Sequence, residues 1–170
     1  EDPDRPPRFV MGHFWIASCC PHRGRWQEPG FGDSRLDAYD EALRYQDEIF
    51  GSIIKYLQKK DVVRPTIVAF FSDHGDEYLD HGGYYHGHSV YYELVRVPLV
   101  LSIPGTRPEK LSARVSLLDI VPSVLDAIGI SQPIMNGVSL IRNRMNVREM
   151  RNRPLFMMGK SDYAALDGEW

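Results

Sequence analysis

The residues Thr66–Gly105 decide the fold of this 170-residue chain; they read TIVAFFSDHGDEYLDHGGYYHGHSVYYELVRVPLVLSIPG. The stretch begins with a continuous apolar run, Thr66–Phe71, whose β-branched and aromatic residues are typical of a strand buried on both faces. A second run of this kind, Val97–Ile103, is stopped by Pro104 and Gly105. We therefore expect two core strands joined by a long polar loop.

A long amphipathic helix is predicted before the first of these strands. Apolar side chains recur at three- and four-residue steps between Ala42 and Leu57, which is the spacing of one helix face. Asp33 and Ser34 are N-cap candidates, and the basic pair Lys59-Lys60 suits the negative end of the helix dipole. The pattern predicts a helix from about residue 34 to residue 60.

Further elements flank this region on both sides. Residues 117–128 fit a second helix that ends at Gly129, and residues 155–158 and 163–166 fit late strands in a hairpin. The short apolar run Phe9–Trp15 is a further strand candidate. Strands that alternate with helices in this way indicate an α/β chain with a mostly parallel sheet flanked by helices.

Composition excludes several classes of protein. The apolar content of 43% and the charged content of 25% are those of a soluble globular domain. A net charge of −3 argues against a nucleic-acid partner, and no apolar run is long enough to cross a bilayer. The adjacent Cys19 and Cys20 do not form a disulfide framework. The polar, proline-rich residues 1–8 are expected to be a linker or a cut end, with no signal peptide.

The best candidate for chemistry is the pair Asp73-His74, which directly follows the first core strand. Functional groups gather at the carboxyl ends of strands in open α/β sheets. A carboxylate beside an imidazole suits a divalent ion, and Gly75 lets the backbone bend away. The alternative is that the pair merely caps the next turn.

Three more histidines follow in the same loop, at positions 81, 86 and 88. Histidine is the residue expected for a metal ligand or a proton donor near neutral pH. Their density favours a functional loop over a solvated polar one, although both interpretations stay open. The neighbouring tyrosines are interpreted as packing residues.

These residues resemble the C-terminal signature of the sulfatase group in the alkaline phosphatase superfamily. That pattern runs roughly S-D-H/N-G-E, then H-G, Y-E-E and R-V-P-L, and ends in P-G. The matching segments here are Ser72–Gly75, His81-Gly82, Tyr91–Glu93, Arg96–Leu99 and Pro104-Gly105. Flanking segments agree with family patterns as well: Tyr39–Ala42, Leu118–Leu125, Gly137–Leu140 and Asp167–Trp170. The likeness therefore extends from about residue 9 to the end.

The resemblance implies a fold and a metal site. Residues 9–170 would be the C-terminal portion of a sulfatase-like catalytic domain, an alkaline-phosphatase-like sandwich with a mostly parallel sheet. Asp73 and His74 would be two ligands of one divalent metal ion. Calcium is the ion that the family favours, and the imidazole of His74 leaves manganese and zinc as alternatives.

The resemblance also implies a donor to the transferring group. Sulfatases commonly carry a lysine near position 86, and phosphoethanolamine transferases carry a histidine in a similar Y-x-H-G setting, which Tyr85-His86-Gly87 resembles. His88 is the competing assignment. Arg96 is expected to brace the loop against a carboxylate, with Glu93 as the candidate partner.

The segment Cys19–Arg23 reads CCPHR and is close to the sulfatase nucleophile motif C-x-P-S-R. In the family, however, the nucleophile lies far upstream of the S-D-H-G strand, whereas this segment lies shortly before it. The slot belongs to a family segment resembling H-x-x-D-P-H-x-P-Y, which places His22 at the substrate as a donor or general acid. Cys19 as the nucleophile and an ordinary loop are the alternatives.

The functional expectation is a metal-dependent sulfuric ester hydrolase, with this chain as its C-terminal part. No D-D or D-Q-x-R segment follows an early strand, so the nucleophile and the other metal carboxylates would come from an N-terminal half or a partner chain. The alternatives are a phosphoryl hydrolase or phosphoethanolamine-type transferase of the same superfamily, and a metal-binding fragment that is inactive alone. Relatives in this family imply an extracytoplasmic location.

Overall fold

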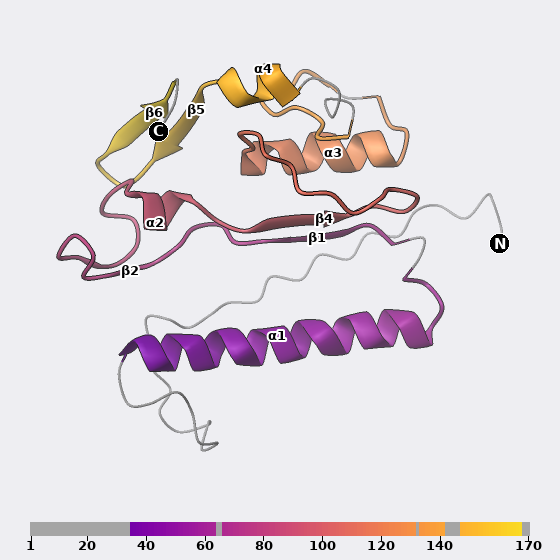
Figure 1. The fold of residues 1–170 in the computed structure, drawn as a ribbon, viewed down its shortest axis with the longest axis horizontal. Coiled ribbons are helices and arrows are strands. Elements are labelled where there is room, and N and C mark those ends of the chain that lie inside the picture. The colour runs from indigo at the N-terminus through magenta and orange to yellow at the C-terminus, as the bar shows by residue number, and fades with distance from the viewer. Residues whose placement is uncertain (1–34, 64–65, 132, 142–146, 168–170) are drawn as a thin grey trace. The chain divides into compact units, whose positions relative to one another are not determined.

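The computed structural model describes residues 35–63, 66–131, 133–141 and 147–167, and Figure 1 shows their fold. The chain divides into two compact units, Glu1–Pro65 and Thr66–Trp170. The strand expected at Phe9–Trp15, the N-cap candidates Asp33 and Ser34, and the CCPHR segment with Cys19 and His22 lie outside the described residues.

The first unit contributes helix α1, Arg35–Lys59, which confirms the predicted amphipathic helix. The helix ends because Asp61 adopts a left-handed backbone conformation, with φ of 53°. The N–H of Asp61 donates to the carbonyl of Gln58, and the N–H of Val62 donates to that of Leu57. These two bonds form a Schellman motif, which satisfies carbonyls that the last turn would otherwise leave unpaired.

The second unit contains the two strands predicted from the apolar runs, β1 (Val68–Phe71) and β4 (Leu99–Ser102). They pair with each other in antiparallel register, Val68 opposite Ser102 and Phe71 opposite Leu99. The predicted parallel sheet is therefore wrong for the described residues, in which each of the three strand pairs is antiparallel.

The connection between β1 and β4 explains the antiparallel direction. Parallel neighbours need a crossover that carries the chain back to the starting end of the sheet. Here the N–H of Gly75 donates to the carbonyl of Leu94 at 2.9 Å, which ties the end of β1 to the start of β4. The burial prediction was also too strong, because Phe70, Phe71 and Val100 are about half exposed.

The loop predicted between the strands has regular structure of its own. Strands β2 (Glu77–Tyr78) and β3 (Tyr84–Tyr85) form a short antiparallel hairpin, followed by the single-turn helix α2 (Tyr92–Val95). Gly82, in the hairpin turn, has a φ of 86° that favours glycine. The hairpin brings the segment around His86 back alongside residues 76 and 77.

The predicted second helix is present as a 3₁₀ turn, η1 (Leu117–Asp119), that continues into α3 (Ile120–Ala127). Ser116 and Asp119 form a capping box at its start. A Schellman pair at Gly129, whose φ is 73°, closes its end. The predicted helix and its end at Gly129 are confirmed, and the capping box at its start is an addition from the structure.

Asp119 is a buried centre of polar contacts in this unit. Its carboxylate accepts hydrogen bonds from the backbone N–H groups of Ser116 and Val138 and from both terminal nitrogens of the Arg153 guanidinium. The residue has no exposed surface. A buried carboxylate is stable only when such partners compensate its lost hydration, so this cluster fixes η1 against the segments around residues 138 and 153.

The chain ends in helix α4 (Val147–Asn152) and a hairpin of β5 (Leu155–Met158) and β6 (Tyr163–Leu166), which confirms the predicted late strands. The turn of this hairpin lies against the histidine loop, because the N–H of Lys160 donates to the carbonyl of Gly87 at 2.8 Å. Buried apolar side chains of this unit include Leu94, Leu140, Met150 and Leu166. None of the described helices is long and apolar enough to cross a membrane.

Candidate metal and histidine site

Asp73 and His74 lie directly after β1, as the sequence predicts. The Nδ1 atom of His74 lies 3.0 Å from the carbonyl oxygen of Gly75. Since a carbonyl can only accept, Nδ1 carries the proton and the neutral ring keeps a lone pair on Nε2. That Nε2 lies 3.8 Å from Oδ2 of Asp73, whose side chain is 67% exposed. One carboxylate oxygen and one imidazole nitrogen are thus open on the same side of the turn.

The backbone of this turn depends on Gly75. A Cβ atom at this position would come within 2.0 Å of the Glu93 carbonyl oxygen, so only glycine fits between the turn and α2. The hydroxyl of Ser72 also donates to the carbonyl of His74 at 2.7 Å. These contacts hold the Asp73-His74 backbone in one position before any ligand binds.

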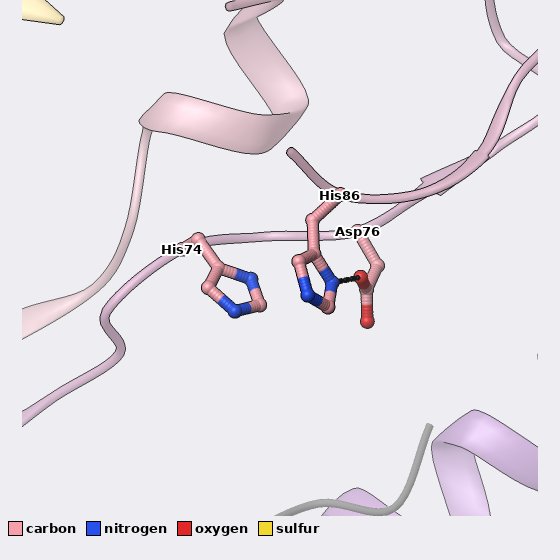
Figure 2. A group of neighbouring side chains, drawn as sticks. All are labelled: His74, Asp76 and His86. Carbon is pink, nitrogen blue, oxygen red and sulfur yellow. Dashed lines mark hydrogen bonds and ion pairs between the residues drawn. The ribbon is translucent and has the colours of Figure 1, made fainter. Parts of the chain in front are cut away.

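His86 lies beside this pair. Its ring centroid is 3.8 Å from that of His74, with the planes tilted by 30°. Its Nδ1 atom donates to Oδ1 of Asp76 at 2.7 Å, and Figure 2 shows the three side chains together. His74, Asp76 and His86 each offer a ligand atom within 4.8 Å of the others. Asp76, which the sequence did not single out, is therefore part of the group.

His88 points to a different carboxylate. Its Nε2 atom donates to Oε2 of Glu77 at 2.8 Å, while Oε1 of Glu77 accepts from the N–H groups of His81 and Gly83 at 2.7 and 2.8 Å. Glu77 is only 1% exposed. A Cβ atom on Gly83 would lie 2.5 Å from the His88 ring, so a larger residue there would push the ring away from Glu77. Glu77 thus holds the hairpin loop together from within.

The pKa of Glu77 reflects this position. Burial raises the pKa of the carboxyl, but hydrogen bonds from Gly83, His88 and His81 lower it, and the net shift is below the ordinary value. A lowered folded-state pKa means that the folded loop binds the ionised carboxylate best. Its contribution to stability is present above pH 4.5 and is lost as the pH falls through the lower pKa of the folded state.

We expect a Glu77→Gln variant to lose this acid dependence. In the wild-type chain, amide hydrogen exchange at His81 and Gly83, relative to the intrinsic rate, should accelerate as the pH is lowered below 4.5. In the variant, exchange at these amides should be fast already at pH 6 and should change little on acidification. An acid response that survives in Glu77→Gln would place its origin at another group.

The remaining loop histidine, His81, pairs with Glu93. Its Nδ1 atom lies 2.7 Å from Oε1 of Glu93, and its ring stacks on Tyr91 at 3.8 Å between centroids. The expected Arg96–Glu93 brace is therefore wrong for the described residues. Arg96 instead lies over the Tyr92 ring, 4.9 Å from its centroid, while Glu93 is paired with His81.

A cavity of about 1000 Å³ opens beside the pair. Asp73, His74 and His86 line it together with Arg96 and with apolar side chains of β4 and β5. Asp76, Glu77 and His88 are absent from its lining. The side chains of His86 and His88 are equally exposed, at 41% and 40%, but His86 lies at the cavity wall, whereas His88 is bonded to the buried Glu77.

Sequence reasoning missed the two carboxylates Asp76 and Glu77. Each is followed ten or eleven positions later by the histidine that binds it, at 86 and 88. That spacing is visible in the sequence but becomes informative only when a hairpin is known to fold the two segments together. His22 lies outside the described residues, so its predicted role at the substrate stays a prediction.

An exposed carboxylate–imidazole pair at a strand end, with a second histidine beside it, is a site of the kind that binds a divalent ion and an anionic group. The sequence model of the Sulfatase family matches residues 9–130. The chain belongs to the sulfatase family.

Similar proteins include a choline-sulfatase from Rhizobium meliloti, 32% identical over 143 residues, which covers 78% of this chain and 27% of the relative. Arylsulfatase K from Mus musculus is 39% identical over 98 residues, covering 56% of this chain and 17% of the relative. A Delta 4,5-hexuronate-2-O-sulfatase from Bacteroides thetaiotaomicron is 27% identical over 145 residues, covering 80% and 30%. The chain thus spans less than a third of the length of these relatives.

Proposed function

We propose that this chain is the part of a metal-dependent sulfuric ester hydrolase that supplies Asp73 and His74 to a divalent ion and His86 to the substrate. The observation that carries the proposal is the convergence of these three side chains on one cavity. The names of the relatives, all sulfatases, support a sulfate ester as the substrate.

The donor set fits a divalent ion. The Asp73 carboxylate is exposed, and the lone pair of His74 Nε2 is kept available because Nδ1 donates to Gly75. Two protein ligands leave most of the coordination shell to other groups, in keeping with carboxylates that a further segment or partner chain provides. When bound, such an ion polarises the oxygens of the ester group as a Lewis acid. We propose calcium, with manganese and zinc as alternatives because of the imidazole.

We assign the donor role to His86 rather than to His88. Nδ1 of His86 is bonded to Asp76, so Nε2 is the ring atom left for a substrate oxygen. Nε2 of His88 is already bonded to the buried Glu77, and His88 does not line the cavity. A donor at His86 would stabilise the negative charge on the transferring group.

The second candidate is phosphoryl transfer by the same site. A histidine donor in a Y-x-H-G setting resembles the phosphoethanolamine transferases more than the lysine-bearing sulfatases. The nucleophile that would separate the two reactions is proposed to lie in an N-terminal half or partner chain. We propose His22 as a further substrate contact and Cys19 as a residue outside the reaction.

Metal binding tests the proposal without requiring turnover. Isothermal titration of the chain with calcium, manganese and zinc should show one site, and the Asp73→Ala/His74→Ala variant should lose it. The matched control is His81→Ala/Glu93→Ala, which removes two members of the other group of potential ligands, Glu77, His81 and Glu93. Loss of binding in the control but not in the first variant would place the ion elsewhere.

Turnover tests the reaction. We expect hydrolysis of an aryl sulfate in preference to the matching aryl phosphate, dependent on the added ion, from the chain together with the segment that supplies the nucleophile. A preference for the phosphate would favour the second candidate. Activity that disappears in Cys19→Ala would contradict the assignment of Cys19 outside the reaction.

A further inference from the structure

We propose that Asp76 is a positioning residue for His86: its carboxylate fixes the imidazole through Nδ1 and so leaves Nε2 at the cavity wall. The inference rests on the proposed function for the role of His86, and on the structure for the contact itself. The Asp76 Oδ1 to His86 Nδ1 distance is 2.7 Å, and the Asp76 side chain is 7% exposed while that of His86 is 41% exposed.

The arrangement of the three side chains favours positioning over direct contact with substrate. Figure 2 shows the His86 ring between the His74 ring and the Asp76 carboxylate. The two histidines line the cavity, and Asp76 does not. Asp76 is thus screened from a bound substrate by the imidazole that it holds.

The free-energy cost of burying a carboxylate also supports a positioning role for Asp76. Burying an ionised carboxylate is costly unless a cationic or hydrogen-bonding partner compensates it. Among the described residues, the His86 imidazole is the partner that the structure gives Asp76. A carboxylate at Nδ1 sets the tautomer and the ring orientation, and it offsets positive charge on the ring when Nε2 also carries a proton.

The backbone on both sides of His86 has an unusual conformation. Tyr85 has a φ of 69° and Gly87 a φ of 85°, so His86 lies between two left-handed residues. A non-glycine residue in this region is held there by its surroundings. The Glu77–His88 contact fixes the loop on one side, whereas the His86 ring itself contacts the His74 ring and is hydrogen-bonded to Asp76.

The first arm of the test observes the His86 ring directly. In the 170-residue chain, ¹⁵N NMR should show that Nδ1 of His86 is protonated and hydrogen-bonded, with the signals identified by their loss in His86→Ala. Asp76→Asn should shift the ring to a mixture of tautomers. Glu93→Gln is the matched control, because it makes the same change beside His81 in the same loop and should leave the His86 signals unchanged.

The second arm separates positioning from ligation. Asp76→Asn should bind the divalent ion with unchanged affinity, unlike Asp73→Ala/His74→Ala. In the presence of the segment that supplies the nucleophile, it should lower kcat for the aryl sulfate by about 10- to 100-fold, the usual effect of removing a partner that orients a functional histidine, with KM little changed. Asp76→Glu should recover part of the loss.

The results of these two experiments separate the positioning role of Asp76 from the proposed function of the chain. Unchanged His86 signals in Asp76→Asn, or a loss of ion affinity equal to that of the Asp73→Ala/His74→Ala variant, would overturn the positioning role. If the chain shows the predicted ring signals and ion binding, but no sulfate ester is turned over when the segment that supplies the nucleophile is present, the Asp76–His86 contact is supported and the proposed function alone is contradicted. Matching thermal unfolding of Asp76→Asn and wild type guards against a folding defect.

Discussion

Replacing Asp119 with alanine is expected to lower the free energy of unfolding of the Thr66–Trp170 unit by about 3–5 kcal/mol. The substitution removes the acceptor of the Arg153 guanidinium and of two backbone N–H groups, and it leaves the Arg153 cation without its partner in a mostly buried position. Urea unfolding followed by circular dichroism measures the loss.

Two further variants identify the cause of this loss. Asp162→Ala removes an exposed carboxylate of the same unit and should change the stability by less than about 0.5 kcal/mol. The double variant Asp119→Leu/Arg153→Met removes both charges and should be clearly more stable than Asp119→Ala, because no buried charge is then left unpaired. A double variant as unstable as Asp119→Ala would assign the loss to the backbone contacts instead.

Replacing His86 with alanine is expected to lower kcat for an aryl sulfate by about 10²–10³-fold, the effect of removing one donor to the transition-state charge. The ion affinity should stay as in wild type, because Asp73 and His74 remain in place. Steady-state kinetics at saturating metal, with the segment that supplies the nucleophile present, measures the change.

Two further variants, His86→Lys and His88→Ala, test whether His86 is the donor. A lysine at position 86 restores a cationic donor of the kind that many sulfatases carry there, so it should recover part of the activity. His88→Ala should act mainly on the loop, through the loss of the Glu77 contact, and should therefore reduce stability in step with activity. A selective loss of kcat in His88→Ala, with His86→Ala unaffected, would reverse the assignment of the donor.

The elements with strong local signals were predictable. Helix α1 follows from its apolar spacing, and α3 from a helix-compatible run that ends at Gly129. The core strands β1 and β4 follow from their apolar runs, but their antiparallel pairing does not, because it depends on how the loop between them returns, with contacts such as the Gly75–Leu94 hydrogen bond. Such a contact between distant residues has no local signature in the sequence.

The candidate site could be predicted from the sequence to about the same extent as the fold. The histidines stand out by their density, and Asp73 by its place after a strand. The carboxylates that orient them, Asp76 and Glu77, look like ordinary polar loop residues until the β2–β3 hairpin places them beside His86 and His88. The choice between the two histidines therefore rests on three-dimensional contacts.

The bond from Lys160 to Gly87 has a consequence for how the site is assembled during synthesis. The loop that carries His86 emerges from the ribosome well before the β5–β6 hairpin that contacts it. Contacts between segments far apart in sequence form late in folding, since the intervening chain must first be ordered. We expect a nascent chain arrested ahead of Leu155 to expose its histidines without the final geometry, so that the site matures only when the last strands arrive.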